Sequence, residues 1–301
     1  MVKYSKYLFV GLLLGASISS QAVFDGVRDR IRDSMVESVV AQIFFNNSNS
    51  IVEVDGKNYP ELNGLFSELA SKAAIKKPMF FLITKKFPWF PLKANAFAVG
   101  DKEVSAVFVG SWTVASLSQD ELAGILAHEI SHISKNHVMR IFKTSLGIGL
   151  ASGIATSHLM QYIAMKLRGN IFASGDRELL GLMERHPVVA DMLIYVIAYG
   201  ISSYCTSVVS SLILASYSRK LEKEADLGAV DVTGNKKVAA GLEKLDAVYK
   251  KYVPFSMWWS SFWFNRMFAT HPQTKDRIKY IEDYVPAQPV SAELAAEVAA
   301  A

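Results

Sequence analysis

Two histidines and a glutamate, arranged as H-E-x-x-H, are the residues of this sequence whose types and spacing suit metal chemistry. They are His128, Glu129 and His132. On a helix, residues four apart lie on the same face, so the two imidazoles can point at a single ion. A zinc ion would take two nitrogen ligands there, and Glu129 would lie beside it as a candidate general base.

The segment that carries this motif is predicted to be a helix on separate grounds. The stretch from Ser118 to Glu121 reads as a capping box, with Ser118 as the N-cap. Apolar residues then repeat at helical spacing: Leu122, Ile125, Leu126, Ile130 and Ile133. Two histidines do not complete a protein zinc site, so a third ligand must come from elsewhere in the chain.

A charged stretch about ninety residues downstream offers that ligand. Its sequence, S-R-K-L-E-K-E-A-D, starts at Ser218 and places Glu222 and Asp226 four residues apart. Glu222 could complete a His-His-Glu site and leave a fourth position open, as catalytic zinc requires. Asp226 could accept a hydrogen bond from the second ring nitrogen of a liganding histidine. Glu224 is a competing ligand, and the whole stretch also fits an ordinary solvated helix face.

The order of these two motifs resembles that of the HtpX-like and CAAX-prenyl-protease-like zinc metallopeptidases. Two further segments match patterns of that family. An N-A-F-A segment begins at Asn95, and an H-P-x-x-x-x-R-I motif begins at His271 and ends at Ile278. All four segments occur in the family's order, so the resemblance spans most of the chain.

The resemblance implies a gluzincin-type metallopeptidase that hydrolyses polypeptides. Its ligands to one zinc ion per chain would be His128, His132 and Glu222. The spacing of the S-R-x-x-E pattern selects Glu222 over Glu224, and Glu129 would be the general base.

Three more roles rest on the resemblance alone. Asn95 would contact the substrate backbone, and His271 and Arg277 would stabilise the oxyanion. Without the resemblance, Asn95 reads as a turn residue, His271 as a loop histidine before a proline and Arg277 as a surface cation.

The implied activity is proteolysis of misfolded, membrane or envelope proteins, which is a quality-control role. Two alternatives remain open: a chaperone or binding factor whose zinc site is latched and seldom active, and a membrane scaffold or transport subunit. A nucleic-acid partner has little support, because the formal net charge is only +4 and no basic run is present. The sequence does not indicate an oligomeric state.

Composition points to membrane segments beside one globular domain. Of the 301 residues, 51% are hydrophobic and 20% are charged. Residues 1–22 fit a cleaved signal peptide, with an uncleaved N-terminal anchor as the alternative. Residues 23–285 form the predicted peptidase domain, interrupted by uncharged apolar stretches at 144–165 and 192–218, and an Ala/Pro-rich tail follows at 286–301.

Each apolar stretch is long enough to cross a bilayer, which takes roughly 20 residues. Because His132 and Glu222 must bind one ion, the chain between them crosses the membrane either twice or not at all. A hairpin that crosses twice would place the cationic loop from Lys166 to Ala190 in the cytoplasm. The catalytic domain would then face the periplasm from a bacterial inner membrane. The alternative is a soluble or peripheral periplasmic protein with buried or interfacial helices.

The predicted fold is α+β and mainly helical, with a small β-sheet next to the zinc-binding helix. Its substrate would add to an exposed sheet edge as an extra strand, unless that edge is closed. The predicted strands are Ile51–Val54, Met79–Thr84, Phe97–Val99 and Val104–Val109. The predicted helices outside the apolar stretches and the two motif helices are Phe24–Phe45, Pro60–Ala74 and Lys237–Tyr252. An aromatic cluster at Phe255–Phe268 fits a membrane-interface belt, a groove lining or plain packing.

Overall fold

The computed structural model describes residues 50–76, 78–84, 93–252 and 271–286. The predicted signal peptide or anchor, the helix at 24–45, the aromatic cluster at 255–268 and nearly all of the tail lie outside the described residues. The chain divides into two compact units. The first holds the described residues up to Val138, together with Ala225–Tyr249 and the residues from Ile281 on. The second holds Met139–Glu224 and the described residues up to Tyr280.

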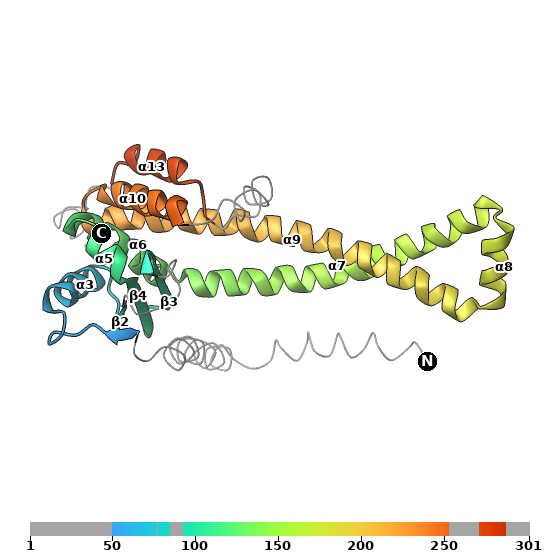
Figure 1. The fold of residues 1–301 in the computed structure, drawn as a ribbon, viewed down its shortest axis with the longest axis horizontal. Helices are drawn as coiled ribbons and strands as arrows, with labels where there is room; N and C mark the ends of the chain where they lie inside the picture. The colour runs from blue at the N-terminus through green and yellow to red at the C-terminus, as the bar shows by residue number, and fades with distance from the viewer. Residues whose placement is uncertain (1–49, 77, 85–92, 253–270, 287–301) are drawn as a thin grey trace, which may run out of the picture. The chain divides into compact units, whose positions relative to one another are not determined.

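The first unit contains the predicted sheet. Its strands are β1 (Ile51–Glu53), β2 (Pro78–Ile83), β3 (Ala96–Gly100) and β4 (Ser105–Gly110). They lie in the order β1-β2-β4-β3 (Figure 1). β2 and β4 run parallel, while β1 and β3 are antiparallel to their neighbours. All four predicted strands are therefore present, and β3 lies at one edge of the sheet.

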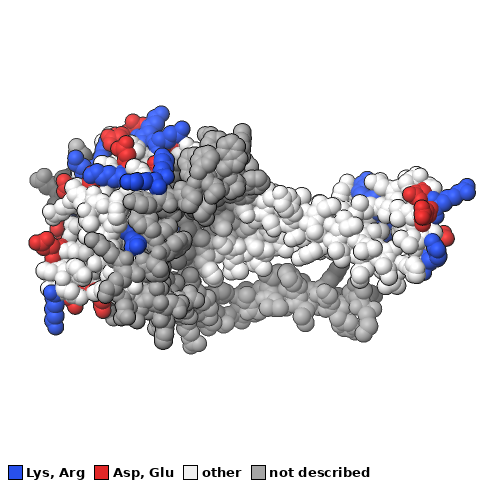
Figure 2. All heavy atoms as spheres, in the orientation of Figure 1, with Lys and Arg blue, Asp and Glu red and all other residues white. Residues whose placement is uncertain are grey.

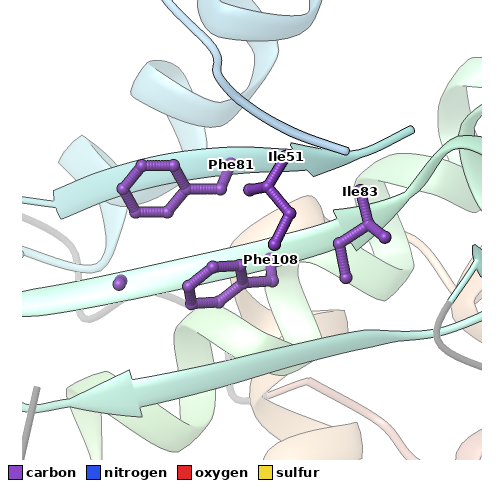
Figure 3. Close-up of a cluster of buried hydrophobic side chains, with 5 residues drawn as sticks. Ile51, Phe81, Ile83 and Phe108 are labelled. Carbon is purple, nitrogen blue, oxygen red and sulfur yellow. The ribbon is translucent and has the colours of Figure 1, made fainter. Parts of the chain in front are cut away.

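The sheet is held together by an apolar cluster on one of its faces. Ile51, Phe81, Ile83 and Phe108 meet there from three neighbouring strands (Figure 3). The rings of Phe81 and Phe108 stack with their centroids 4.9 Å apart. Every residue of β4 is buried, as expected for a central strand with packing on both faces.

The turn between β3 and β4 has the shape that its sequence predicts. Gly100 has a φ of 99°, and a Cβ there would lie 2.2 Å from the carbonyl oxygen of Val104. The Asp101 carboxylate accepts hydrogen bonds from the backbone N–H groups of Glu103 and Val104. Only glycine fits at position 100 without a clash.

Short helices complete the first unit. They are α3 (Pro60–Lys72), α5 (Ser111–Ser116), α6 (Gln119–Ser134) and α10 (Lys237–Tyr252), whose residues from Lys250 on fall in the second unit. The motif helix α6 packs against β3, β4 and α3. The last described helix is α13 (Thr274–Glu282). Helix α10 lies close against α6, because a Cβ at Gly124 would be 2.7 Å from the backbone of Val238.

The second unit is mainly a helical hairpin. Helix α7 (His137–Ser174) and helix α9 (Pro187–Thr233) lie side by side, and α8 (Arg177–Arg185) joins them at one end (Figure 1). Two hydroxyl pairs hydrogen bond across the hairpin: Ser152 with Ser210 at 2.5 Å and Thr156 with Thr206 at 2.7 Å. The segment from Lys166 to Ala190, expected as a loop, is largely helical.

The hairpin exposes apolar side chains along its length. Leu146, Leu150 and Ile154 are each more than half exposed, at 56%, 64% and 55%. Charged residues are absent from the visible face of the hairpin's span and gather near α8 (Figure 2). By length and composition, α7 and α9 are both able to cross a membrane. Such a large apolar surface is unfavourable in water, so the hairpin is suited to a membrane.

Replacement of Gly124 by alanine tests the close packing of α6 and α10. The added methyl group would meet backbone atoms of Val238 that cannot rotate away, so we expect a loss of about 1–3 kcal/mol of stability. Gly64→Ala in α3 is the matched control, because nothing lies within 4 Å of the added Cβ. Thermal unfolding of the detergent-solubilised protein should show a lower Tm for Gly124→Ala alone. Equal Tm values for the two variants would contradict the packing.

Candidate metal centre

Helix α6 presents the H-E-x-x-H motif and begins where the sequence predicts. The N-cap Ser118 accepts a hydrogen bond from the Glu121 backbone N–H, and the Glu121 carboxylate accepts one from the Ser118 backbone N–H at 2.8 Å. The Nζ atom of Lys244 also contacts this carboxylate at 2.7 Å. The capping box fixes the start of α6, and the Lys244 contact joins that start to α10. The helix carries both histidines on one face.

The two motif histidines face each other through one ring nitrogen each. The Nε2 atoms of His128 and His132 are 3.1 Å apart, and their rings meet edge to face at 75°. Two nitrogen ligands at 2.0–2.1 Å from a tetrahedral zinc ion would be about 3.3 Å apart. The observed separation is close to that value. Glu129 follows His128 directly and is partly buried.

The second ring nitrogen of His128 is held by a buried carboxylate. Its Nδ1 lies 2.8 Å from Oδ1 of Asp226, and Asp226 is fully buried. The C-terminal part of α9 approaches α6 closely here, since a Cβ at Gly228 would lie 2.6 Å from Oγ of Ser131. The sequence-based pairing of Asp226 with a motif histidine thus has a geometric counterpart. A carboxylate in this place keeps the proton on Nδ1 and leaves Nε2 able to bind a metal.

Glu222 lies one turn before Asp226 on the same uninterrupted helix. It is 5% exposed, and one of its carboxylate oxygens lies within 4.8 Å of one ring nitrogen from each of His128 and His132. Two imidazoles and one carboxylate form a donor set that suits zinc with an open fourth position. The residues present therefore fit a catalytic metal ion.

Two residues of the late motif contact the Glu222 carboxylate. Nδ1 of His271 lies 2.9 Å from Oε2, and an Arg277 guanidinium nitrogen lies 3.6 Å from the same oxygen. Arg277 is buried, whereas the side chain of His271 is 65% exposed. Their expected role is to stabilise an oxyanion. In the described structure both contact the proposed third ligand.

Asn95 lies just before the edge strand β3 and is exposed. Its side-chain oxygen accepts a hydrogen bond from the Ala96 N–H, and its carbonyl accepts bonds from the Gly110 N–H and the Thr113 hydroxyl. These contacts anchor its backbone at the end of the sheet. They neither support nor oppose a contact with substrate.

The competing carboxylate, Glu224, forms an ion pair instead. It contacts Arg140 with an N–O distance of 2.6 Å. The sequence reasoning missed this pair because its partners lie on α7 and α9, far apart in the chain. It also missed His137, a fully buried residue whose Nδ1 lies 3.0 Å from Nδ1 of His132. The signal for His137 was a third histidine five residues after the motif.

Comparison with known proteins matches this chain to a family. The profile described as "Peptidase family M48" matches residues 57–285, which is well over half of the chain. The chain belongs to peptidase family M48. Membership makes it a metallopeptidase, and it confirms the resemblance to the HtpX-like family.

Several curated relatives carry the name of HtpX. "Protease HtpX" of Legionella pneumophila is 29% identical over 72% of this chain and 74% of the relative. "Protease HtpX" of Erwinia tasmaniensis is 29% identical over 62% of this chain and 61% of the relative. "Protease HtpX homolog" of Methylibium petroleiphilum is 26% identical over 78% of each chain.

One solved structure is also similar. The crystal structure of S. mikatae Ste24p matches with a TM-score of 0.47 and 16% identity, over 91% of this chain and 61% of that one. A likeness at this level adds nothing to the assignment, which rests on the family profile.

The stabilising effect of the α6 capping box should depend on pH. The Lys244 ammonium, followed by the Ser118 N–H, holds the pKa of Glu121 below the usual range of a glutamate. A lowered pKa in the folded state gives stability that is present above the unfolded-state pKa and lost as pH falls through the folded-state pKa. The difference in unfolding free energy between wild type and Glu121→Gln should therefore be larger at pH 7 than at pH 3.5. Chemical denaturation at both pH values measures it, and a constant difference would contradict the contact.

Proposed function

We propose that this chain is a zinc-dependent endopeptidase with His128, His132 and Glu222 as the metal ligands and Glu129 as the general base. The observation that carries the proposal is the convergence of these three ligands, from two helices, within 4.8 Å. The buried contact in which Asp226 accepts from Nδ1 of His128 adds to it, because ligand histidines usually have such a partner.

The residues around the site have distinct tasks in peptide hydrolysis. A bound zinc ion would supply Lewis-acid polarisation of the scissile carbonyl and lower the pKa of water. Glu129 takes the proton from the attacking water and later delivers it to the leaving amine nitrogen. Asp226 keeps His128 in the tautomer that leaves Nε2 free for the metal.

His271 and Arg277 are placed to respond to charge at the reacting centre. Both contact Oε2 of Glu222, the proposed third ligand. Arg277 is a fixed, buried cation, so it offsets negative charge at the site throughout the reaction. Small rotations would let either residue donate to a tetrahedral oxyanion, which is the role that the family resemblance implies.

The edge strand β3 offers a place for the substrate backbone. β3 is the last strand of the sheet and packs against α6, the helix that bears the motif. An extended peptide can pair with such an edge through main-chain hydrogen bonds, largely independent of its sequence. Asn95, anchored at the start of β3, would then contact the backbone of the bound peptide.

The proposed substrates are misfolded membrane or envelope proteins, in a role of quality control. Two features support this: the relatives named Protease HtpX and the exposed apolar hairpin. The hairpin would cross a bacterial inner membrane twice, with the catalytic residues on the periplasmic side. We keep the proposed peptidase domain at 23–285, between a proposed export signal or anchor at 1–22 and the tail at 286–301.

A second candidate function is favoured by one contact. Because Nδ1 of His271 lies 2.9 Å from Oε2 of the proposed ligand Glu222, the site could be held closed in a chaperone or binding factor that seldom cuts. Such a protein would bind unfolded chains and zinc but would show little turnover. The rate of casein cleavage by the wild-type protein separates the two functions.

Replacement of Glu129 by glutamine should remove catalysis and keep metal binding. Loss of the proton acceptor should lower the rate of casein cleavage by about 10²–10⁴-fold. Zinc content, measured by elemental analysis, should stay near one per chain. Glu243→Gln, an exposed change on α10, is the control and should cleave at the wild-type rate. If Glu129→Gln cleaved casein at the wild-type rate, Glu129 would not be the general base.

The hairpin topology predicts opposite exposure of two engineered cysteines. In a Cys205→Ser background, Gly181→Cys labels α8 and Gly64→Cys labels α3. An impermeant maleimide added to intact spheroplasts should modify position 64, and position 181 only after lysis. Labelling of both positions before lysis would favour a hairpin that does not cross the membrane. Labelling of position 181 alone before lysis would indicate the opposite orientation in the membrane.

A further inference from the structure

The buried histidine that follows the motif is held in place by a break between two helices. Helix α6 ends at Ser134, and Asn136 adopts a left-handed conformation with φ of 55°. The N–H groups of Lys135 and Asn136 bond to the carbonyls of Ser131 and Ile133, which closes the helix end. His137 then starts α7 with its side chain directed back toward α6, where it is fully buried.

His137 contacts His132 through a specific pair of atoms. The two Nδ1 atoms are 3.0 Å apart, and the rings meet edge to face at 83° with centroids 4.9 Å apart. A hydrogen bond between two ring nitrogens needs one that carries a proton and one that presents a lone pair. The question is therefore which histidine donates.

Metal binding decides the direction of this bond. If Nε2 of His132 binds a metal ion, it must present its lone pair, so the neutral ring carries its proton on Nδ1. That proton points at His137, whose Nδ1 must then accept and whose own proton must lie on Nε2. We propose that His137 is a positioning residue that fixes the tautomer and orientation of His132 for metal binding. This inference rests on the proposed metal site.

The two ligand histidines would then have different partners. His128 is backed by the carboxylate of Asp226, and His132 by an imidazole that is neutral in this tautomer. The carboxylates of Glu222 and Asp226 already supply two negative charges close to a divalent ion. A neutral acceptor behind His132 orients the ring without a third charge there, so the ion retains more of its Lewis acidity.

A matched pair of variants separates the acceptor from the packing. His137→Asn places an amide oxygen at nearly the same distance from the backbone as Nδ1, and His137→Leu fills the space without an acceptor. The full chain in detergent is stripped of metal, and its zinc affinity is measured by competition with a chromogenic chelator. The dissociation constant should rise by about 10–100-fold in His137→Leu, and most of that loss should be recovered in His137→Asn. The visible spectrum of bound Co²⁺ should change in His137→Leu and resemble wild type in His137→Asn.

Each outcome bears on the proposal. Wild-type zinc affinity in His137→Leu would overturn it, and so would equal losses in both variants, because packing alone would then explain the effect. Thermal unfolding of the metal-free proteins shows whether His137→Leu folds, and His137→Met replaces it if it does not. If the wild-type chain itself bound no zinc, the proposed function would fail together with this inference. If the wild-type chain shows zinc-dependent activity and His137→Leu binds zinc with unchanged affinity, the inference about His137 fails and the proposed function stands.

Discussion

The bond between His128 and the buried carboxylate of Asp226 is the interaction on which the centre depends. A carboxylate with no exposed surface is unfavourable by several kcal/mol unless hydrogen bonds or charges offset the lost hydration. The imidazole N–H offers one such bond, and it joins α6 to α9 at the level of the motif. Gly228 allows the two helices to come close enough for this bond to form.

The position of Asp226 also sets the position of Glu222, because both residues lie on one helix. Helix α9 runs without interruption from Pro187 to Thr233, so an apolar segment and a charged segment form a single element. The sequence between Gly200 and Gly228 contains neither glycine nor proline, and nothing in it would end a helix. Once Asp226 is bonded to α6, helical geometry leaves Glu222 one turn away on the same face. The position of the proposed third ligand thus follows from the placement of Asp226.

Local patterns were sufficient to predict the strands, the capped motif helix and the relation between Glu222 and Asp226. The capping box and the period of the apolar residues act within a few positions of each other, so they can be read directly from the sequence. The pairing of Arg140 with Glu224 could not be read in this way, since it depends on how α7 lies beside α9. The contact of His271 with Glu222 is long-range for the same reason. Helix α8 was missed because its nine residues contain Gly181 and lie between Gly175 and Pro187, a pattern that fits a loop equally well.

Glu222 and Glu224 lie only two residues apart on α9, but they have different partners. Residues two apart on a helix point about 200° away from each other, so only one of these carboxylates can face the motif histidines. Glu224 turns toward α7 and meets Arg140, whose guanidinium neutralises it. Glu222 turns toward the motif, where His271 and Arg277 are its described partners in addition to the two histidines of the donor set. A divalent cation among these groups would balance the charges of Glu222 and Asp226, and this charge balance supports the proposed metal site.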